Sequence, residues 1–246
     1  MLILRARINK EIVCEFAPPV GRANGKAVII ASGAPTYPKC AFIEKFARLG
    51  YFCVVPRYRG SWESDGTFLQ RSPEIDIQDT IAQFEKGFVS IWDGVHYRPR
   101  IKKIILVGSS FGGPAALLCS KHTKVSSVIA VSSVVDWPEI ENGVENFTFT
   151  VRFFREAFGN GYRVAKYGWK RLYAGKFYNP ATEIGKIDPK KIIFIHAKDD
   201  ESVPYPAVKQ FAHDLGAPII TLNKGGHLGT RVLFRKSILQ KIKKYL

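Results

Sequence analysis

The chain begins with two segments in which hydrophobic and polar residues alternate. They are LILRARI (2–8) and EIVCEFA (11–17), and Asn9 and Lys10 separate them. A period of two is typical of half-buried strands, and a two-residue connection predicts an antiparallel hairpin with a tight turn. We expect this hairpin to form one edge of a sheet.

From Lys26 onward the hydrophobic residues come in short unbroken runs. The runs are KAVIIAS (26–32), YFCVVP (51–56), IKKIILVG (101–108), VSSVIAVS (125–132), KIIFIHA (191–197) and APIITL (217–222). Unbroken runs of this length suit strands that are buried on both faces, as in a parallel sheet flanked by helices.

Segments long enough for helices lie between these runs. They span 37–50, 73–88, 111–122, 205–215 and 229–246. Strand and helix therefore alternate, and right-handed crossovers then give an open, twisted α/β sheet with its ligand site at the carboxyl ends of the strands. In the last segment Phe234, Ile238, Ile242 and Tyr245 recur at helical spacing, and we expect them to pack on the sheet.

Residues 136–180 interrupt this alternation, because they are far longer than an ordinary crossover. Aromatic and basic residues are interleaved over 147–178. We interpret the segment as a lid within one domain that spans residues 1–246, since a lid needs one face for an apolar pocket and one for water. The same mixture also suits an anionic membrane surface or stacking on single-stranded nucleic acid, although no nucleic-acid motif accompanies it.

The chain is strongly basic, with 37 Lys and Arg against 21 Asp and Glu and a formal charge of +16. The excess extends well beyond the insert, so we interpret most of it as a solvated surface. We expect no nucleic-acid partner and at most a weak association with anionic surfaces. The four cysteines are far apart, which predicts buried thiols instead of a metal or redox site.

The N-terminus, MLILRARINKEIVCEF, has no signal-peptide pattern, and no apolar run approaches the roughly 20 residues that span a bilayer. These two observations predict a cytoplasmic protein.

GSSFGG (108–113) lies between a predicted strand and a predicted helix. It contains G-x-S-x-G in the context that a nucleophile elbow requires, with Ser110 at the centre of a sharp strand-to-helix turn. Glycines are needed there because larger side chains would collide with neighbouring backbone. We therefore predict that Ser110 is a nucleophile at the carboxyl end of its strand, above the positive end of a helix.

A serine hydroxyl needs a base to accept its proton, and the base needs a carboxylate to orient it. His227 follows the last predicted strand in NKGGHLG, at the same edge of the sheet as Ser110, and it is the candidate base. The loop KDDESVP (198–204) follows KIIFIHA and offers Asp199, Asp200 and Glu201. Serine, acid and histidine thus occur in the chain order of an α/β-hydrolase triad.

With these residues the sequence resembles the α/β-hydrolase superfamily over nearly its whole length. The acid loop of that family commonly reads D-x-x-V-P, which here starts at Asp200, so the resemblance implies that Asp200 is the acid and leaves Asp199 as the second choice. It also implies an oxyanion hole made by the backbone N–H groups of Phe111 and Ala34, although the turn Ser32-Gly33-Ala34-Pro35 has serine where the family usually has histidine.

A second likeness concerns PRYRGSWESDGTF (56–68), which is similar to loops of esterases and of prolyl-oligopeptidase-type peptidases. We expect this loop to buttress the oxyanion turn. The alternative is that Arg57 and Arg59 face the pocket.

The resemblance implies a serine hydrolase that acts without cofactor or metal, and our first hypothesis is a carboxylesterase acting on a small acyl ester through an acyl-enzyme. A prolyl-oligopeptidase-type peptidase and an acyl thioesterase use the same chemistry and remain alternatives. Against the peptidase, we expect no room in 246 residues for a propeller domain. A non-catalytic module that binds an anionic membrane or nucleic acid is the alternative from another class.

Overall fold

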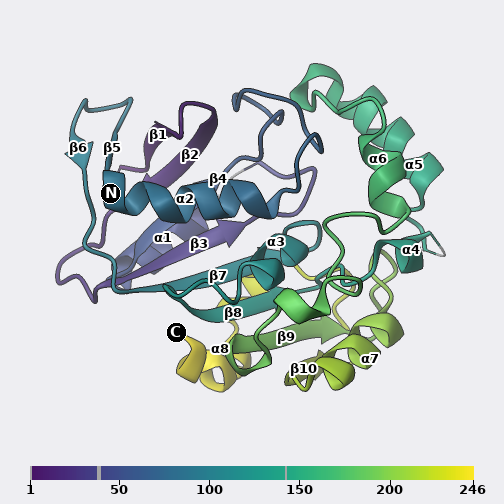
Figure 1. The fold of residues 1–246 in the computed structure, drawn as a ribbon. Helices are drawn as coiled ribbons and strands as arrows, with labels where there is room; N and C mark the ends of the chain where they lie inside the picture. The colour runs from purple at the N-terminus through teal and green to yellow at the C-terminus, as the bar shows by residue number, and fades with distance from the viewer. Residues whose placement is uncertain (1, 38–39, 142) are drawn as a thin grey trace.

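The computed structural model describes residues 2–37, 40–141 and 143–246. Its main sheet has eight strands in the order β1-β2-β4-β3-β7-β8-β9-β10 (Figure 1). Their bounds are β1 Leu4–Ile8, β2 Ile12–Ala17, β3 Lys26–Ala31, β4 Phe52–Pro56, β7 Lys103–Ser109, β8 Val125–Val131, β9 Ile192–Ala197 and β10 Ile219–Leu222. In this sheet the neighbouring pairs β4–β3, β3–β7, β7–β8, β8–β9 and β9–β10 are parallel. The pairs β1–β2 and β2–β4 are antiparallel. The predicted α/β-hydrolase fold, a mostly parallel twisted sheet with an antiparallel N-terminal hairpin, is confirmed.

The hairpin is one residue longer at its turn than the sequence pattern predicted. Ile8 pairs with Ile12, so three residues, Asn9 to Glu11, make the connection. Residues directly opposite each other point to the same face of a sheet. A two-residue turn would place Glu11 beside Ile8 in the core, whereas the observed register places Ile12 there.

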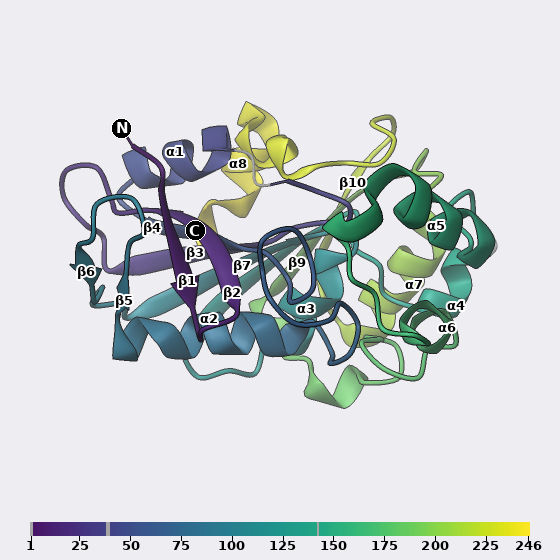
Figure 2. The ribbon, with the colours of Figure 1, turned by 90° about the horizontal axis from the view of Figure 1, so that it is seen from above.

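Helices cover both faces of the sheet (Figure 2). α1 (Cys40–Arg48) and α8 (Lys236–Ile242) pack on one face, and α2 (Glu74–Lys86), α3 (Gly112–Leu118) and α7 (Tyr205–Leu215) pack on the other. Because each face of the central strands meets a layer of hydrophobic side chains, the unbroken runs seen in the sequence are buried on both sides.

The C-terminal segment is not the single helix that its spacing predicted. A 3₁₀-helix (Thr230–Phe234) precedes α8, and another (Lys243–Tyr245) follows it. Arg235 has an extended ψ of 128° and separates the first two. Because of this break, Val232 and Leu233 reach the hydrophobic cluster that also contains Ile238 and Ile242. One straight helix would present its hydrophobic side chains on a narrower stripe.

A short hairpin between α2 and β7 was not predicted. It pairs β5 (Phe88–Val89) with β6 (His96–Tyr97) and lies outside the main sheet. Two-residue strands carry too little periodicity to be detected from a sequence.

Three of the four cysteines confirm the prediction of buried thiols. Cys14, Cys53 and Cys119 are buried and form no disulfide, and burial raises the pKa of the Cys14 thiol to about 12. The side chain of Cys40 lies outside the described part of the structure. No helix in the described ranges has both the length and the hydropathy to cross a membrane.

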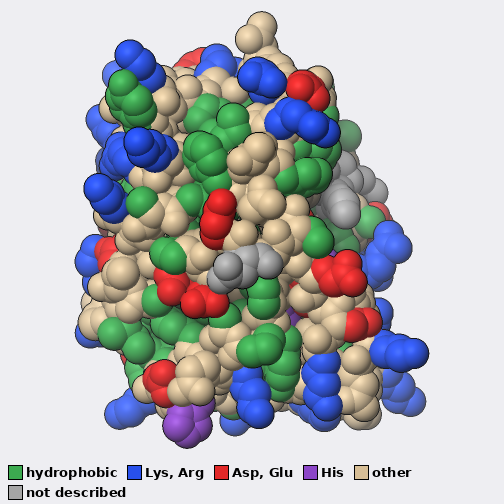
Figure 3. Space-filling view, turned by 90° about the vertical axis from the view of Figure 1, so that its right-hand side faces the viewer, with side chains coloured by type: hydrophobic (Ala, Val, Ile, Leu, Met, Phe, Trp, Pro, Cys, Tyr) green, Lys and Arg blue, Asp and Glu red, His purple; other side chains and the backbone are tan. Residues whose placement is uncertain are grey.

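The insert folds beyond the carboxyl ends of the parallel strands (Figures 1 and 2). It contains α4 (Trp137–Ile140), α5 (Phe147–Phe153), a π-helical turn (Phe154–Phe158), a 3₁₀ turn (Gly159–Gly161) and α6 (Gly168–Tyr173). Figure 3 looks onto this end of the molecule and shows Lys and Arg mostly at the margins, with hydrophobic side chains between them.

Backbone hydrogen bonds attach the second half of the insert to the loop that follows β4. Phe68 donates to Arg163 O at 2.8 Å and accepts from Ala165 N at 2.8 Å, and Trp62 N donates to Gly161 O at 2.7 Å. The Phe68 ring is fully buried and packs against Tyr58, Phe111, Tyr162 and Trp169. Phe68 therefore joins the loop, the insert and the strand-to-helix turn into one packed unit.

We predict that Phe68→Ala lowers the free energy of unfolding by about 3–5 kcal/mol, because the lost ring leaves a cavity where three segments meet. Urea denaturation should show a lower midpoint at an unchanged slope. The control Ile184→Ala removes a side chain that is 40% exposed and should cost less than about 0.5 kcal/mol. Equal losses in the two variants would contradict this role of Phe68.

Candidate active site

Ser110 lies at the turn between β7 and α3, in a left-handed backbone conformation with φ of 52°. Two glycines let the turn pack this tightly. A Cβ at Gly112 would lie 2.1 Å from the carbonyl oxygen of Ala31, and one at Gly113 would lie 1.8 Å from Ser133 Oγ. Larger residues there would displace backbone, which is the reason that the sequence pattern needs glycine.

The loop after β8 holds the serine backbone on both sides. Ser110 N donates to Val131 O at 3.1 Å, and Val134 N donates to Ser110 O at 3.3 Å. Tyr178, at the end of the insert, is fully buried; its hydroxyl donates to Phe111 O at 2.6 Å and accepts from Ala115 N at 3.1 Å. The turn is thus fixed by the next strand and by the insert.

His227 Nδ1 and the carboxylate of Asp200 are hydrogen-bonded, at 3.0 Å to Oδ1 and 3.1 Å to Oδ2. The Asp200 side chain is fully buried, whereas that of His227 is 30% exposed. The backbone N–H groups of Ser202 and Val203 also donate to Asp200 Oδ1, at 3.1 and 3.0 Å. Burial acts to raise the pKa of Asp200, but the hydrogen bonds from His196 and His227 outweigh it and hold that pKa well below its usual range.

The structure separates the two candidate acids. Asp199 does not contact His227; its carboxylate accepts from Gly225 N at 3.2 Å and Gly226 N at 2.9 Å. It therefore secures the loop that carries the histidine. On the other side of His227, Leu228 N donates to Ser132 Oγ at 3.0 Å.

Ser132 belongs to the same loop that bonds to the backbone of Ser110, so the histidine loop and the serine turn share one support. Among the described residues, Ser110 Oγ and His227 do not form a hydrogen bond with each other. Such bonds are often long in enzymes without substrate and tighten when substrate binds.

The environment of His227 favours its protonated form. Burial acts to lower its pKa, but the hydrogen bond to Asp200, the charge of Asp200 and the charge of Glu145 together raise it above the usual 6.5. Asp200 also selects the tautomer, because an ionised carboxylate requires the proton on Nδ1 and leaves the lone pair on Nε2.

His196, the penultimate residue of β9, is fully buried and makes a contact that was not predicted from the sequence. Its Nε2 lies 3.2 Å from Asp200 Oδ2 and 2.9 Å from Val203 O, and its Nδ1 has no hydrogen-bond partner among the described residues. Both neighbouring oxygens are acceptors, so Nε2 carries a proton; it is hydrogen-bonded to Val203 O, and Asp200 Oδ2 lies beside it. The only sequence signal is a histidine four residues before the candidate acid.

The two candidate oxyanion donors, Ala34 and Phe111, both line the pocket at Ser110. Within the described ranges, neither backbone N–H donates a hydrogen bond to the protein. The turn at Gly33 touches the serine turn, since a Cβ at Gly33 would lie 3.2 Å from Ser110 Cβ. Tyr58 supports that turn from behind, through a 2.9 Å hydrogen bond from its hydroxyl to Ser32 O.

This contact shows that the loop 56–68 buttresses the turn at residues 32–35, the candidate oxyanion turn. Arg57 and Arg59 do not line the pocket at Ser110. Arg57 is buried and forms ion pairs with Glu15 and Glu63, and Arg59 is bound by Glu11, Asp76 and Asp79.

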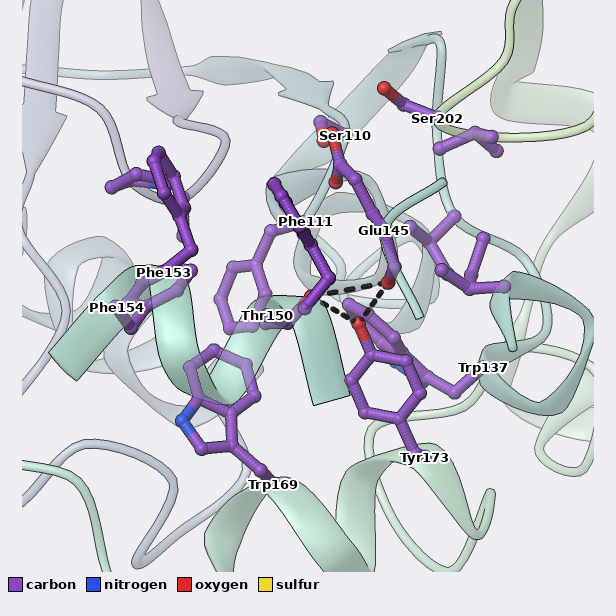
Figure 4. A pocket seen from close by; sticks show the side chains of 16 residues that line it. Ser110, Phe111, Trp137, Glu145, Thr150, Phe153, Phe154, Trp169, Tyr173 and Ser202 are labelled. Atoms are coloured by element: carbon purple, nitrogen blue, oxygen red, sulfur yellow. Dashed lines mark hydrogen bonds between the residues drawn. The ribbon is translucent and has the colours of Figure 1, made fainter. Parts of the chain in front are cut away.

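The pocket at Ser110 lies between the turns of the sheet and the insert, and it encloses about 540 Å³ including its open mouth. Figure 4 shows the rings of Phe111, Phe153, Phe154, Trp169 and Tyr173 around it. At one end, the hydroxyls of Thr150 and Tyr173 lie 2.7 Å apart and both donate to the backbone oxygen of Glu145. A mostly apolar group of modest size fits these walls.

The insert contributes aromatic side chains of differing exposure to the pocket. Phe154 and Trp169 are buried, whereas Phe149 and Phe153 are 44% and 38% exposed and line the pocket at the same time. In the described ranges no three His, Cys, Asp or Glu side chains converge as metal ligands would.

Known proteins are similar to this chain in sequence family and in fold. The family model for the prolyl oligopeptidase family matches residues 41–234. No curated protein matches the sequence. Among solved structures, the esterase Pf2001 of Pyrococcus furiosus aligns with a TM-score of 0.69 and 14% identity, over 100% of this chain and 89% of that one.

Est1E from Butyrivibrio proteoclasticus aligns with a TM-score of 0.66 and 14% identity, over 99% of this chain and 98% of its own. The acylaminoacyl peptidase of Pyrococcus horikoshii aligns with a TM-score of 0.64 and 18% identity, over 99% of this chain but only 40% of that one. These likenesses show the fold, and the family match extends over most of the sequence. The chain belongs to the prolyl oligopeptidase family and is a hydrolase of the α/β-hydrolase type.

Proposed function

We propose that the protein cleaves carboxylic esters through an acyl-enzyme, with Ser110 as nucleophile, His227 as base and Asp200 as the acid that orients the base. The observation that carries this proposal is the hydrogen bond between the buried Asp200 and His227 at the sheet edge that also bears Ser110. Ester hydrolysis by this route needs no cofactor.

In the first half of the reaction, Ser110 Oγ attacks the ester carbonyl and forms a tetrahedral intermediate, while its proton passes to His227 Nε2. Asp200 stabilises the imidazolium that results and keeps the ring oriented. The backbone N–H groups of Ala34 and Phe111 receive the developing oxyanion, a role supported by their lack of other partners in the described chain. His227 then gives the proton to the departing alkoxide as the carbon–oxygen bond breaks.

In the second half, His227 takes a proton from water, and the resulting hydroxide attacks the acyl-enzyme carbonyl. The intermediate collapses, the acyl group leaves as a carboxylic acid, and the proton returns to Ser110. The insert acts as the lid of the proposed site, because its aromatic side chains form the wall that keeps water from the acyl group.

A peptidase is the second candidate, and the family match favours it. The same groups would cleave an amide, with His227 protonating the amine as it leaves. We place the ester first because the pocket is small and its walls are mostly hydrophobic.

We propose in addition that His196 is a positioning residue for Asp200. Asp200 could rotate about its side-chain bonds if only one oxygen were held. Two backbone N–H groups bind Oδ1, His227 Nδ1 contacts Oδ1 at 3.0 Å and Oδ2 at 3.1 Å, and His196 Nε2 lies 3.2 Å from Oδ2. A carboxylate fixed at both oxygens presents one constant acceptor to the base.

Substitution of Ser110 tests the nucleophile. Ser110→Ala should abolish labelling by a fluorophosphonate probe and lower the hydrolysis of p-nitrophenyl butyrate at least about a thousandfold. The neighbouring Ser109→Ala is the control and should still be labelled. If folded wild type is not labelled, the catalytic proposal is wrong; if it cleaves butyryl p-nitroanilide faster than the ester, the peptidase replaces the esterase.

The pH profile tests the base. The pKa of His227 is raised, and the base must be neutral to accept a proton. On the acidic limb of the pH profile, kcat/KM should therefore fall to half of its maximum at a pH above 6.5. Asp200→Asn removes the carboxylate that raises this pKa, so the limb of the residual activity should move to lower pH. An unmoved limb would mean that His227 is not the titrating group.

A pair of variants tests the positioning role of His196. His196→Leu removes the donor to Asp200 and should lower kcat about tenfold to a hundredfold, with KM nearly constant, as expected for the loss of one hydrogen bond to a charged group. His196→Gln can place an amide N–H near the same oxygen and should recover most of kcat. Each rate is divided by the concentration of active sites, which is measured by titration with the fluorophosphonate. If kcat is equal in both variants, His196 contributes only to packing.

A further inference from the structure

The pocket at Ser110 contains a single charged side chain among the described residues that line it, Glu145. The other lining residues are aromatic, aliphatic, or carry only a hydroxyl. A carboxylate in such surroundings is unusual, because a hydrophobic pocket for a neutral acyl chain gains nothing from it.

The backbone at Glu145 is held in place, and its side chain faces the reaction centre. Tyr173 OH donates to Glu145 O at 2.6 Å, and Thr150 Oγ1 donates to the same oxygen at 3.1 Å. From this point the side chain extends along the pocket toward Ser110 (Figure 4). Its charge also contributes to the raised pKa of His227, which places the carboxylate within electrostatic reach of the base.

Within the described chain no lysine or arginine forms an ion pair with Glu145, although basic residues are far more numerous than acidic ones. On the face that bears the insert, Lys and Arg lie mostly at the margins, and several acidic side chains lie nearer the middle (Figure 3). The charge in the pocket is therefore opposite in sign to the net charge of the protein.

A carboxylate that has no ion-pair partner in the described chain attracts the same kind of group as the faces of aromatic rings. Aromatic faces bind ammonium groups through their quadrupole, most strongly where water is excluded. The rings of Phe153, Trp169 and Tyr173 line the same pocket as Glu145. A cationic amine in that space would meet both, whereas a second carboxylate would be repelled.

We propose that Glu145 makes this pocket selective for acyl groups that carry a cationic amine a few bonds from the ester carbonyl. The inference rests on the proposed hydrolysis at Ser110 and adds the substrate class to it. Glu145 is a specificity-determining residue that binds the substrate, and it takes no part in the proton transfers.

Three p-nitrophenyl esters of similar size test this selectivity. They are the ester of γ-trimethylammoniobutyrate, its neutral isostere with a quaternary carbon in place of nitrogen, and the anionic ester of glutarate. Wild type should have the highest kcat/KM for the cationic ester and the lowest for the anionic one, after each is divided by its uncatalysed rate.

Glu145→Gln keeps the size of the side chain and removes its charge. The ratio of kcat/KM between the cationic and the neutral ester should fall about tenfold, the size expected when one charged partner of a partly buried pair is lost. The control Glu139→Gln removes an exposed carboxylate from α4, outside the pocket, and should leave this ratio as in wild type. Since each ratio is taken within one variant, a difference in the fraction of folded protein cancels.

The possible results separate the two proposals. If wild type cleaves the neutral ester but the ratio is the same in Glu145→Gln, the selectivity is wrong and the esterase stands. If no ester is cleaved and Ser110 is not labelled, both are wrong. If Glu145→Gln does not fold, inhibition of the wild type tests the inference. Butyltrimethylammonium should inhibit cleavage of the neutral ester competitively, and its inhibitory concentration should be at least about tenfold lower than that of hexanol. Equal inhibition by the two would overturn the inference.

Discussion

The buried carboxylate of Asp200 is the constraint on which the arrangement of the site depends. Taking an ionised carboxylate out of water costs several kcal/mol unless hydrogen bonds replace the lost water. This cost is on the order of the net free energy of unfolding of a whole domain. Two backbone N–H groups and His227 supply them, and His196 Nε2 lies 3.2 Å from Oδ2. The bend after β9, the position of His196 and the approach of the His227 loop all follow from the need to satisfy that one charge.

The serine turn is held by a different set of contacts. Its glycines pack against β3 and against the loop after β8, and the hydroxyl of Tyr178 binds both Phe111 O and Ala115 N. The two halves of the site meet at the end of β8 and in the residues that follow it, where Val131 and Val134 bond to Ser110 and Ser132 bonds to Leu228. The relative placement of serine and histidine therefore depends on one short segment between β8 and the insert.

Much of this was readable from the sequence, because it depends on local signals. Unbroken hydrophobic runs located every strand of the parallel sheet, and glycine spacing located the serine turn. The likeness to D-x-x-V-P singled out Asp200, and the structure places that carboxylate, and not Asp199, against His227. The catalytic roles of these residues remain predictions.

Other features depend on contacts that no local pattern records. The hairpin turn is one residue longer because Ile12, and not Glu11, has to face the core. His196 lies in an ordinary buried strand, and only the bend after Ala197 brings the carboxylate back to its ring. Glu145 belongs to the insert, whose path is set by tertiary packing and not by periodicity, so its position in the pocket could not be derived from spacing.

The hydrogen bonds between Phe68 and residues 163–165 fasten the later part of the insert to the body of the protein, and Tyr178 fastens its end. Among the described residues, the stretch that carries Glu145, Phe149 and Phe153 has no comparable ladder of backbone bonds to the loop after β4. Displacing this part of the wall would break fewer hydrogen bonds, so an entering substrate would meet the least resistance beside the carboxylate proposed to select it.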